Sequence, residues 1–244
     1  SDAGTVATMR LGDIANVDAA ANGKPLDGIR VLALEQMQAL PYATQLLGRL
    51  GAEVVKIESV NGGDMGRSSQ PSMTDPDGRQ VGATFLRNNL SKRSICIDLK
   101  SDEGRQLVLE LAPRFDVVAE NFKAGGLARL GLGYDDIAAV HPGVVYLSVS
   151  GFGNTTDSPY KDRPAFAAIV EAMSGIYDYQ ARNDKAPQAS PVGALGDISA
   201  ALFGAIGVLA ALRQKDRTGE GQYVDVAMLD ALIAMTDIVA NFWS

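Results

Sequence analysis

Residues 29–57 read IRVLALEQMQALPYATQLLGRLGAEVVKI, and this stretch decides the predicted fold. Two short runs rich in Val, Ile and Leu, at 29–34 and 54–57, have the composition of buried strands. Pro41 suits the first turn of the helix that we expect over 42–50, because the amide hydrogen that proline lacks has no partner there. A strand, a helix and a strand in this order form a βαβ unit, which joins two parallel strands by a right-handed crossover.

The same alternation continues along the chain. We expect further strands at 94–97, 117–118, 144–149 and 222–226, and further helices at 101–111, 169–175, 198–214 and 229–239. Ser101 is the expected N-cap of the first of these helices. The polar stretch 61–81 is too long for a simple connector and is expected to be a functional or a mobile loop. Together these elements predict an α/β fold with an open, mostly parallel Rossmann-like sheet flanked by helices.

The composition narrows the function classes. The chain has 244 residues, of which 46% are hydrophobic and 21% charged, which excludes a wholly disordered or fibrous protein. Its longest apolar stretch, 200–212, is interrupted by glycines, so we expect no membrane span. The single Cys96 and the single His141 argue against a disulfide framework and against a Cys-rich or multi-His metal site, so no metal is expected. A net charge of −7 argues against general binding to nucleic acid.

The two ends of the chain differ from its middle. Residues 1–24 are rich in Ala, Gly and Asp, lack the basic and apolar regions of a signal peptide, and are expected to be an extension or a tag. Residues 233–244 follow an apolar helical pattern that has no Gly or Pro stop signal. We therefore expect the architecture to continue beyond this sequence.

Asp197 is the acidic residue of greatest interest. The loop after the first predicted strand lacks the glycines of a dinucleotide-binding fingerprint, and the chain has no P-loop, which disfavours nucleotide cofactors. Asp197 follows the sequence GALG at 193–196, in which three of the four residues are small, and precedes an apolar helix, whose dipole is expected to keep it ionised. This position is typical of an N-cap, but the small neighbours also suit a carboxylate nucleophile that a bulky substrate must reach.

A second candidate site follows the strand predicted at 117–118. Residues 120–126 combine an aromatic ring, a lysine and two glycines after that strand. Ligands of open α/β sheets bind at the carboxyl ends of strands, so the segment suits an anionic group attached to a ring system. A loop with routine helix capping is the alternative.

Nine segments of the chain occur in an order and spacing that resemble one enzyme family. They are residues 25–32, 51–58, 89–98, 120–122, 150–153, 158–160, 162–166, 196–197 and 218–222. The sequence resembles the class III CoA-transferases, the family of formyl-CoA transferase and carnitine CoA-transferase, which shares its fold with the alpha-methylacyl-CoA racemases. The resemblance covers residues 25–244.

The resemblance implies an enzyme that moves coenzyme A between carboxylic acids, with acyl-CoA as substrate and no metal. Asp197 matches the family's catalytic aspartate, which forms an aspartyl mixed anhydride and then an aspartyl-CoA thioester. The resemblance also implies a CoA-binding large domain at 25–217 and a strand and helix at 218–244 that lead towards a second, smaller domain. Family members form interlocked homodimers, and we expect a cytoplasmic enzyme.

The resemblance further implies which residues contact the substrates. Residues matching the family's CoA contacts are Gln38, Ala39, Ile97, Asp98, Leu99, Lys100, Asn121, Phe122, Lys123 and Arg129. Phe166 and Ala167 are expected to line the active site.

Three positions depart from the family pattern. Ser59 stands where many members have an arginine, for which Arg67 is a possible substitute, and Ala167 stands where members often have an acid. A catalytically impaired paralogue that binds CoA thioesters therefore remains one alternative. An acyl-CoA racemase is another, although Phe166 replaces the racemase histidine and cannot move a proton.

Overall fold

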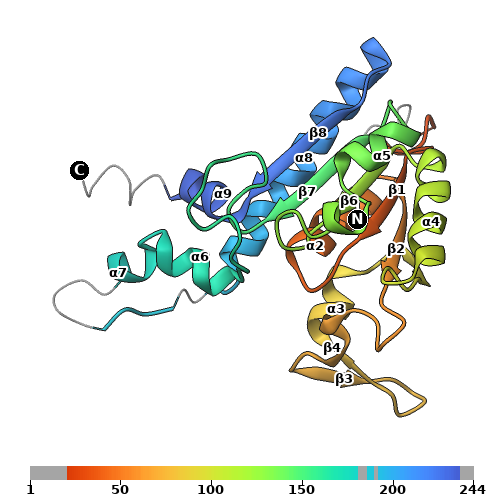
Figure 1. The fold of residues 1–244 in the computed structure, drawn as a ribbon. Helices are drawn as coiled ribbons and strands as arrows, with labels where there is room; N and C mark the ends of the chain where they lie inside the picture. Colours follow the sequence, from red (N-terminus) through yellow and green to blue (C-terminus); the bar gives the residue numbers. More distant parts are fainter. Residues whose placement is uncertain (1–20, 181–185, 190–191, 237–244) are drawn as a thin grey trace, which may run out of the picture.

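The computed structural model describes residues 21–180, 186–189 and 192–236. Within these residues, six parallel strands form one sheet in the order β5-β2-β1-β6-β7-β8 (Figure 1). In chain order, the strands are β1 (Arg30–Leu34), β2 (Glu53–Glu58), β5 (Lys92–Cys96), β6 (Val117–Glu120), β7 (Val145–Ser150) and β8 (Gln222–Ala227). The predicted α/β fold with an open, mostly parallel sheet is confirmed.

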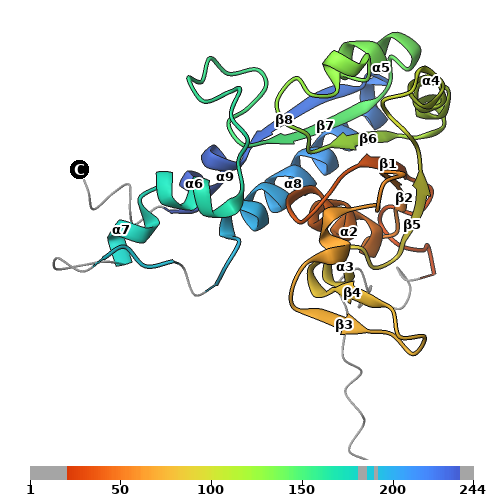
Figure 2. The ribbon, with the colours of Figure 1, turned by 60° about the horizontal axis from the view of Figure 1, so that its bottom comes forward.

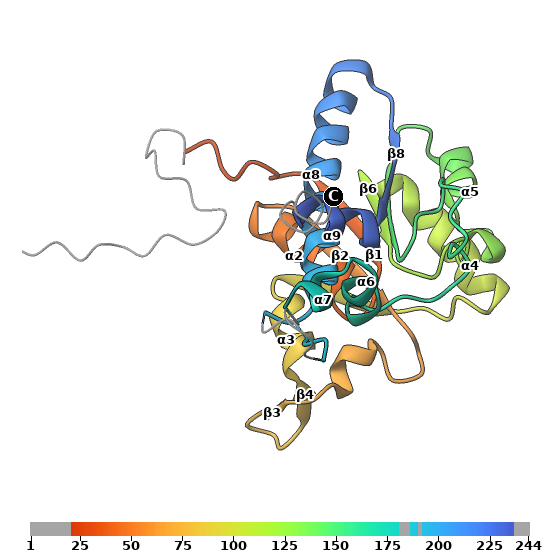
Figure 3. The same cartoon turned by 90° about the vertical axis from the view of Figure 1, so that its left-hand side faces the viewer.

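Helices cover both faces of this sheet, as the edge-on view in Figure 3 shows. One face carries α2 (Ala39–Arg49) and α8 (Leu195–Thr218), and the other carries α4 (Asp102–Leu111) and α5 (Tyr134–Val140). The sheet and its helices form the three layers that are typical of doubly wound α/β proteins.

Successive residues of β1 pack alternately into the two hydrophobic cores that lie between these layers. Val31 and Ala33 pack in the cluster that contains α2 and α8, whereas Leu32 and Leu34 pack in the cluster on the opposite face. Because successive side chains of a strand point to opposite faces, a strand that is buried on both sides must be apolar throughout. This requirement explains the continuous apolar run from which the strand was predicted.

The remaining elements are short. They are the helices α3 (Ala83–Asn88), α6 (Ala167–Met173), α7 (Ile176–Gln180) and α9 (Met228–Met235), the 3-10 helices η1 (Met65–Ser68), η2 (Ala112–Arg114) and η3 (Ala128–Leu130), and the strands β3 (Ser72–Thr74) and β4 (Gln80–Gly82). The last two pair antiparallel as a hairpin that projects from the sheet (Figure 2). The stretch 61–81, predicted as a loop, is therefore largely ordered as η1 and this hairpin.

The strand order places a crevice in the sheet. The strands that follow β1 in the chain, β2 and β5, lie on one side of β1 in the sheet. The later strands β6, β7 and β8 lie on its other side. The direction of growth thus reverses between β1 and β6. In open α/β sheets, ligands bind outside the carboxyl ends of the strands at such a reversal.

Most predicted boundaries agree with the structure. Ser101 caps α4, since its hydroxyl oxygen accepts a hydrogen bond of 3.0 Å from the amide of Gly104. Helix α8 begins three residues before the predicted residue 198, at Leu195, which changes the position of Asp197 within it. Strand β8 pairs with β7, so the segment that begins at 218 completes the sheet. The domain boundary after 217 and the N-terminal extension stay predictions.

Helix α8 is the longest helix that the described residues form. Its 24 residues are long and apolar enough to cross a membrane by length and composition alone, which the sequence analysis did not anticipate. In the structure half of its most apolar window is buried, and Ala201, Ala205 and Val208 pack in the core beneath the sheet. A core helix of this kind passes the same test without entering a membrane.

A cluster of buried charges lies beside the carboxyl end of β1. Lys56 of β2 is 1% exposed, and its ammonium group donates a hydrogen bond to the carboxylate of Asp64 and another of 3.0 Å to Asn89. Glu35, also buried, accepts a hydrogen bond of 2.6 Å from Lys92. Burial lowers the pKa of Lys92 to about 8, although the charge of Glu35 opposes the shift. Such pairs resist disruption because either ion alone would be left uncompensated.

We predict that Asp64→Asn lowers the free energy of unfolding by about 3 kcal/mol, because it leaves the ammonium of Lys56 without its nearest counter-ion. Urea denaturation followed by circular dichroism measures the change. The matched control is Asp77→Asn, which breaks an exposed ion pair with Arg79 and is expected to cost less than about 1 kcal/mol. Equal losses in the two variants would contradict the structural role of Asp64.

Candidate active site

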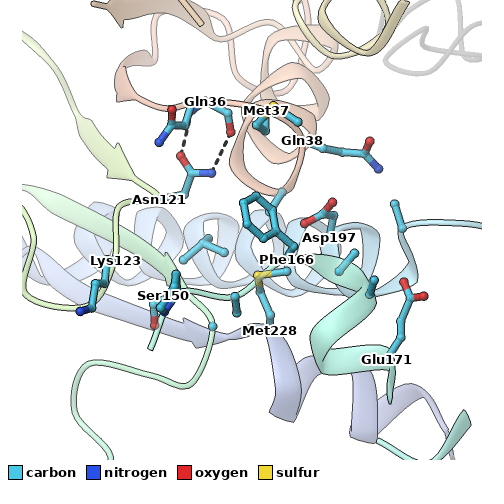
Figure 4. A pocket seen from close by; sticks show the side chains of 18 of the residues that line it. Gln36, Met37, Gln38, Asn121, Lys123, Ser150, Phe166, Glu171, Asp197 and Met228 are labelled. Carbon is cyan, nitrogen blue, oxygen red and sulfur yellow. Dashed lines mark hydrogen bonds between the residues drawn. The ribbon is translucent and has the colours of Figure 1, made fainter. Parts of the chain in front are cut away.

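A cavity of about 560 Å³ opens at the carboxyl ends of β1, β6 and β7. Its wall combines the loops that follow these strands, residues 163–168 before and within α6, and the turn that begins α8 (Figure 4). The cavity therefore occupies the crevice where the strand order reverses.

Two hydrogen bonds join the loops after β1 and β6. The side-chain oxygen of Asn121 accepts a bond of 3.0 Å from the amide of Gln36, and its side-chain nitrogen donates one of 2.9 Å to the carbonyl of Gln36. Figure 4 shows this pair at the edge of the cavity. Asn121, predicted as a CoA contact, thus also fixes the distance between the two loops.

The loop after β1 is held in an uncommon conformation. Met37 has a φ of 63°, in the left-handed region that side chains other than glycine rarely adopt. Its amide donates a hydrogen bond of 2.9 Å to Asp64, the partner of Lys56. The buried charge cluster therefore holds Met37 in the wall of the cavity, where such strain commonly accompanies function.

Gln38, the next residue, presents an unused donor. It occupies the N-cap position of α2 but makes no capping hydrogen bond with its side chain. Its side-chain nitrogen is buried and has no hydrogen-bond partner in the structure. A buried donor left unsatisfied costs about 1–3 kcal/mol, so a partner from a ligand would recover that free energy.

Asp197 lies at the same end of the cavity as Gln38 (Figure 4). It is the third residue of α8, and Ala194 occupies the N-cap position, so the interpretation of Asp197 as the N-cap is wrong. The turn before it is left-handed at both Gly193, with a φ of 64°, and Ala194, with a φ of 50°. This turn brings the carboxylate to the cavity wall instead of leaving it to cap its own helix.

Glu171 of α6 is a site residue that the sequence analysis missed. Its side chain is 2% exposed and accepts hydrogen bonds from the amide of Gly196, at 3.2 Å, and from the hydroxyl of Tyr177, at 2.6 Å. The approach of α6 to α8 requires glycine at 196, because a β-carbon there would overlap the side chain of Val170. Glu171 is therefore anchored to the residue that precedes Asp197.

Burial controls the charge of Asp197. Burial, followed by the negative charge of Glu171, raises the pKa of the Asp197 carboxyl to about 6. The dipole of α8 favours an anion in the first turn, as expected, but desolvation outweighs it. Asp197 is therefore ionised at neutral pH, with a higher proton affinity than an exposed aspartate has.

The remaining predicted site residues fall into three groups. Those that line the cavity together with Asp197 and Gln38 are Ala39, Asn121, Phe122, Lys123, Phe166 and Ala167. Those that line an adjoining cavity of about 220 Å³ are Ile97, Asp98, Leu99 and Lys100, and Phe122 borders both cavities. Arg129 is exposed in η3, outside the lining of either cavity.

Two further residues named from the sequence have other partners. Arg67, considered as a substitute for an arginine at 59, binds both oxygens of Glu58 at 2.7 Å and lies over the ring of Phe85. Burial opposes ionisation of Glu58, but Arg67 and its other hydrogen-bond donors lower the pKa of its carboxyl to about 2. His141 lies between α5 and β7, with its ring nitrogen 3.0 Å from the carbonyl of Phe115.

Other cavity residues were also missed, since their positions depend on tertiary structure. They are Met37, Met65, Ser150, Gly151, Arg163, Tyr177 and Met228. Segments 150–153 and 162–166 were noted as family motifs, so the motifs were the only signal for three of these residues. No group of three or more His, Cys, Asp or Glu side chains that could hold a metal is found among the described residues.

A buried acid supports the loop that carries Asn121 and Phe122. Glu120 ends β6, accepts a hydrogen bond of 2.7 Å from the amide of Phe122, and accepts another from the hydroxyl of Ser148. Glu120, Ser148 and Asp225 stand at the same register on three adjacent strands. Burial raises the pKa of Glu120 to about 7, and the nearby charge of Asp225 adds to this shift.

The sequence model of CoA-transferase family III matches residues 26–242. The chain belongs to this family. The resemblance found in the sequence is thereby confirmed.

Relatives within CoA-transferase family III share about two residues in five with this chain. It is 41% identical over 214 residues to a succinyl-CoA:mesaconate CoA-transferase of Haloarcula hispanica, covering 87% of this chain and 54% of the relative. It is 38% identical to a succinyl-CoA:glutarate CoA-transferase of Mus musculus, covering 90% of this chain and 49% of the relative. The chain spans about half the length of these relatives.

Solved structures agree with this assignment. A CAIB/BAIF family protein from Brucella suis superposes with a TM-score of 0.83 at 38% identity, covering 90% of this chain and 57% of that one. The protein Rv3272 from Mycobacterium tuberculosis superposes with a TM-score of 0.81 at 35% identity, covering 90% and 59%. The fold of this chain is therefore similar to that of CAIB/BAIF family proteins.

We predict that Glu120→Gln raises the free energy of unfolding at pH 8 by roughly 2–3 kcal/mol. The folded-state pKa of Glu120, about 7, exceeds its ordinary value of 4.5, so folding is disfavoured increasingly as pH rises from 4.5 to 7 and the full penalty remains above 7. Urea denaturation at pH 4.5, 6 and 8 measures it. The free energies of unfolding of Glu120→Gln and of the natural protein should differ least at pH 4.5. The control Glu220→Gln, at an exposed position, should change the free energy of unfolding little at any pH. A difference in the free energy of unfolding that does not depend on pH would contradict the raised pKa of Glu120.

Proposed function

We propose that this protein transfers coenzyme A from a CoA thioester to the carboxylate of a second acid. The observation that carries the proposal is the meeting, in one cavity, of the Asp197 carboxylate and the unpartnered donor of Gln38. A carboxylate can attack a thioester, and a preorganised donor stabilises the oxyanion that forms. Membership of CoA-transferase family III supports this chemistry.

The proposed reaction proceeds through covalent intermediates on Asp197. Its carboxylate attacks the thioester carbonyl, the carbon–sulfur bond breaks, and CoA leaves as a thiolate, which gives a mixed anhydride with the donor acid. The thiolate attacks the aspartyl carbonyl, releases the donor carboxylate and forms an aspartyl-CoA thioester. The acceptor carboxylate then attacks this thioester and expels the thiolate. Attack of the thiolate on the acceptor carbonyl gives the new acyl-CoA and restores Asp197.

The two adjoining cavities suit the two ends of a CoA thioester. The reacting acyl group belongs in the larger cavity beside Asp197, and the phosphates and adenosine belong near Lys100 in the smaller one. Phe122 lines both cavities and would contact the chain that connects the two ends. Direct contacts from Lys100 and Lys123 to phosphate would offset the net negative charge of the protein.

Dicarboxylic acids are the substrates that we propose. Relatives are named for succinyl-CoA with mesaconate, D-citramalate, glutarate or L-malate. Arg163 lines the larger cavity, and its guanidinium group would bind the distal carboxylate of such an acid. We also propose that the enzyme is a homodimer, as the resemblance implies, and that it is cytoplasmic.

Racemisation is the less favoured reaction. Phe166 is 58% exposed at the cavity, and its ring cannot exchange a proton with an α-carbon. An impaired paralogue was motivated by Ala167, but α6 carries a buried acid one turn later, at Glu171. Exchange of labelled succinate into succinyl-CoA separates these alternatives, since only the transferase produces it.

We predict that Asp197→Asn lowers kcat for this exchange by at least about a thousandfold, because the amide cannot form the anhydride. Isothermal titration with CoA should give a Kd within about threefold of the natural protein, since Asp197 does not hold the nucleotide. Asp102→Asn, at an exposed position on α4, is the matched control and should retain full activity. Substantial exchange by Asp197→Asn would contradict the proposed nucleophile.

We predict that Lys100→Ala raises the KM for succinyl-CoA by about tenfold, through the loss of a charge-assisted hydrogen bond to phosphate. The KM for succinyl-pantetheine, which lacks the nucleotide, should stay unchanged. Arg217→Ala, which removes an exposed cation at the far end of α8, should affect neither substrate. Equal effects of Lys100→Ala on both thioesters would contradict the assignment of the smaller cavity to the nucleotide.

A further inference from the structure

Glu171 is a buried acid for which the proposed mechanism has no step. It lines the larger cavity at the same end as Asp197 (Figure 4). At 2% exposure it is less accessible than Asp197, which retains partial contact with the cavity. A buried carboxylate is costly unless surrounding groups compensate its charge, so its retention at this place calls for an explanation.

Two donors hold the carboxyl group of Glu171 in place. The amide of Gly196 in the first turn of α8 donates to one oxygen at 3.2 Å, and the hydroxyl of Tyr177 in α7 donates to the other at 2.6 Å. Both contacts require oxygen acceptors, which suits an ionised carboxylate. The side chain thereby ties α6 and α7 to the turn that presents Asp197.

Glu171 lies one turn after a position at which members of the resembled family often have an acid. Ala167 occupies that position in this chain and is buried in the first turn of α6. Residues four apart on a helix lie on the same side, so Glu171 follows Ala167 by one turn along the cavity wall. Both residues line the cavity.

We propose that Glu171 is a positioning residue for Asp197, which fixes the turn at Gly196 and holds a negative charge beside the nucleophile. This inference rests on the proposed function. A neighbouring negative charge makes the Asp197 carboxylate more basic and hence a stronger nucleophile. The repulsion between the two carboxylates also disappears when Asp197 becomes an anhydride or a thioester, so it favours acylation over the resting state.

Other charged or titratable groups surround the same cavity. Tyr177 approaches from α7, Lys123 from the loop after β6, and Arg163 from the loop after β7. The electrostatic influence on Asp197 comes from Glu171, in addition to burial. Tyr177 acts on Glu171 itself, and this contact raises the pKa of the tyrosine to about 12, so that its hydroxyl keeps its proton.

The test is the proton affinity of Asp197 in Glu171→Gln. This variant keeps the shape of the side chain and an oxygen acceptor but removes the charge. The carboxyl of Asp197 is titrated by carbon-13 NMR in protein labelled at aspartate, and its signal is assigned by its loss in Asp197→Asn. We expect a midpoint of about 6 in the natural protein and one closer to about 5 in Glu171→Gln. An unchanged midpoint in the folded variant overturns the proposal.

Activity gives a second, separate readout. The acid limb of the kcat/KM profile should move to lower pH in Glu171→Gln, and kcat at pH 8 should fall several-fold while the Kd for CoA stays constant. A change in Kd with no movement of the acid limb would indicate a merely structural role and overturn the proposal. If the natural protein exchanges no acid at all, the proposed function fails, but the NMR titration still decides the role of Glu171.

Two further variants sharpen the test. Adding Ala167→Asp to Glu171→Gln restores a negative charge on the same side of α6 and should move the midpoint back towards about 6. Glu171→Asp keeps the negative charge but shortens the side chain by one methylene group. The titration midpoint of Asp197 in this variant should therefore lie between those of the natural protein and of Glu171→Gln. This variant replaces Glu171→Gln if Glu171→Gln does not fold. If Glu171→Gln folds, failure of Ala167→Asp to move its midpoint back overturns the proposal. If Glu171→Gln does not fold, a midpoint in Glu171→Asp equal to that of the natural protein overturns it.

Discussion

The ion pair between Lys56 and Asp64 is the interaction on which the site depends. Lys56 points from β2 into a region that excludes water, so its charge requires close partners. Asp64 meets this need and, with its other oxygen, accepts the amide hydrogens of Met37 and Gly66. One buried carboxylate therefore links the sheet, the segment before the hairpin and the loop that lines the cavity. The strain at Met37 persists because this network holds it.

The same principle operates at the opposite wall of the cavity. There, the left-handed turn at Gly193 and Ala194 and the hydrogen bond from Gly196 to Glu171 direct Asp197 towards the cavity. A helix N-terminus alone would make this aspartate a weaker base, whereas burial and the charge of Glu171 make it a stronger one. A carboxylate that must attack and later leave benefits from such an intermediate proton affinity, because it stays ionised at neutral pH.

The sequence predicts the sheet well because its strands are buried on both faces. Such strands must be apolar along their whole length, as the runs at 29–34 and 144–149 are, and local composition reveals them. The hairpin β3–β4 was missed because its strands have three residues each and many polar side chains. The start of α8 was misplaced because it depends on Ala194 adopting a left-handed conformation, which local propensity disfavours.

The residues of the candidate site that lie in recognisable sequence segments could be predicted from the sequence. Asp197 and the residues at 121–123 were singled out from their local sequence, the family resemblance gave them roles and added Gln38, and the structure gathers them in one cavity. Glu171 was not found, because its role arises from contacts with Tyr177 and with Gly196, which lies 25 residues along the chain. A single acid within the apolar pattern of α6 was its only signal in the sequence.

The most direct test of the account follows oxygen atoms through turnover. If an acceptor carboxylate attacks an aspartyl-CoA thioester, the bridging oxygen of the resulting anhydride comes from the acceptor and stays on Asp197. A single turnover of succinyl-CoA with an acceptor acid labelled with oxygen-18 in its carboxylates should therefore add one heavy oxygen to the peptide that contains Asp197, as measured by mass spectrometry, and repeated turnover should add a second. Exchange of acids without label on Asp197, or with label on Glu171 instead, would contradict the account.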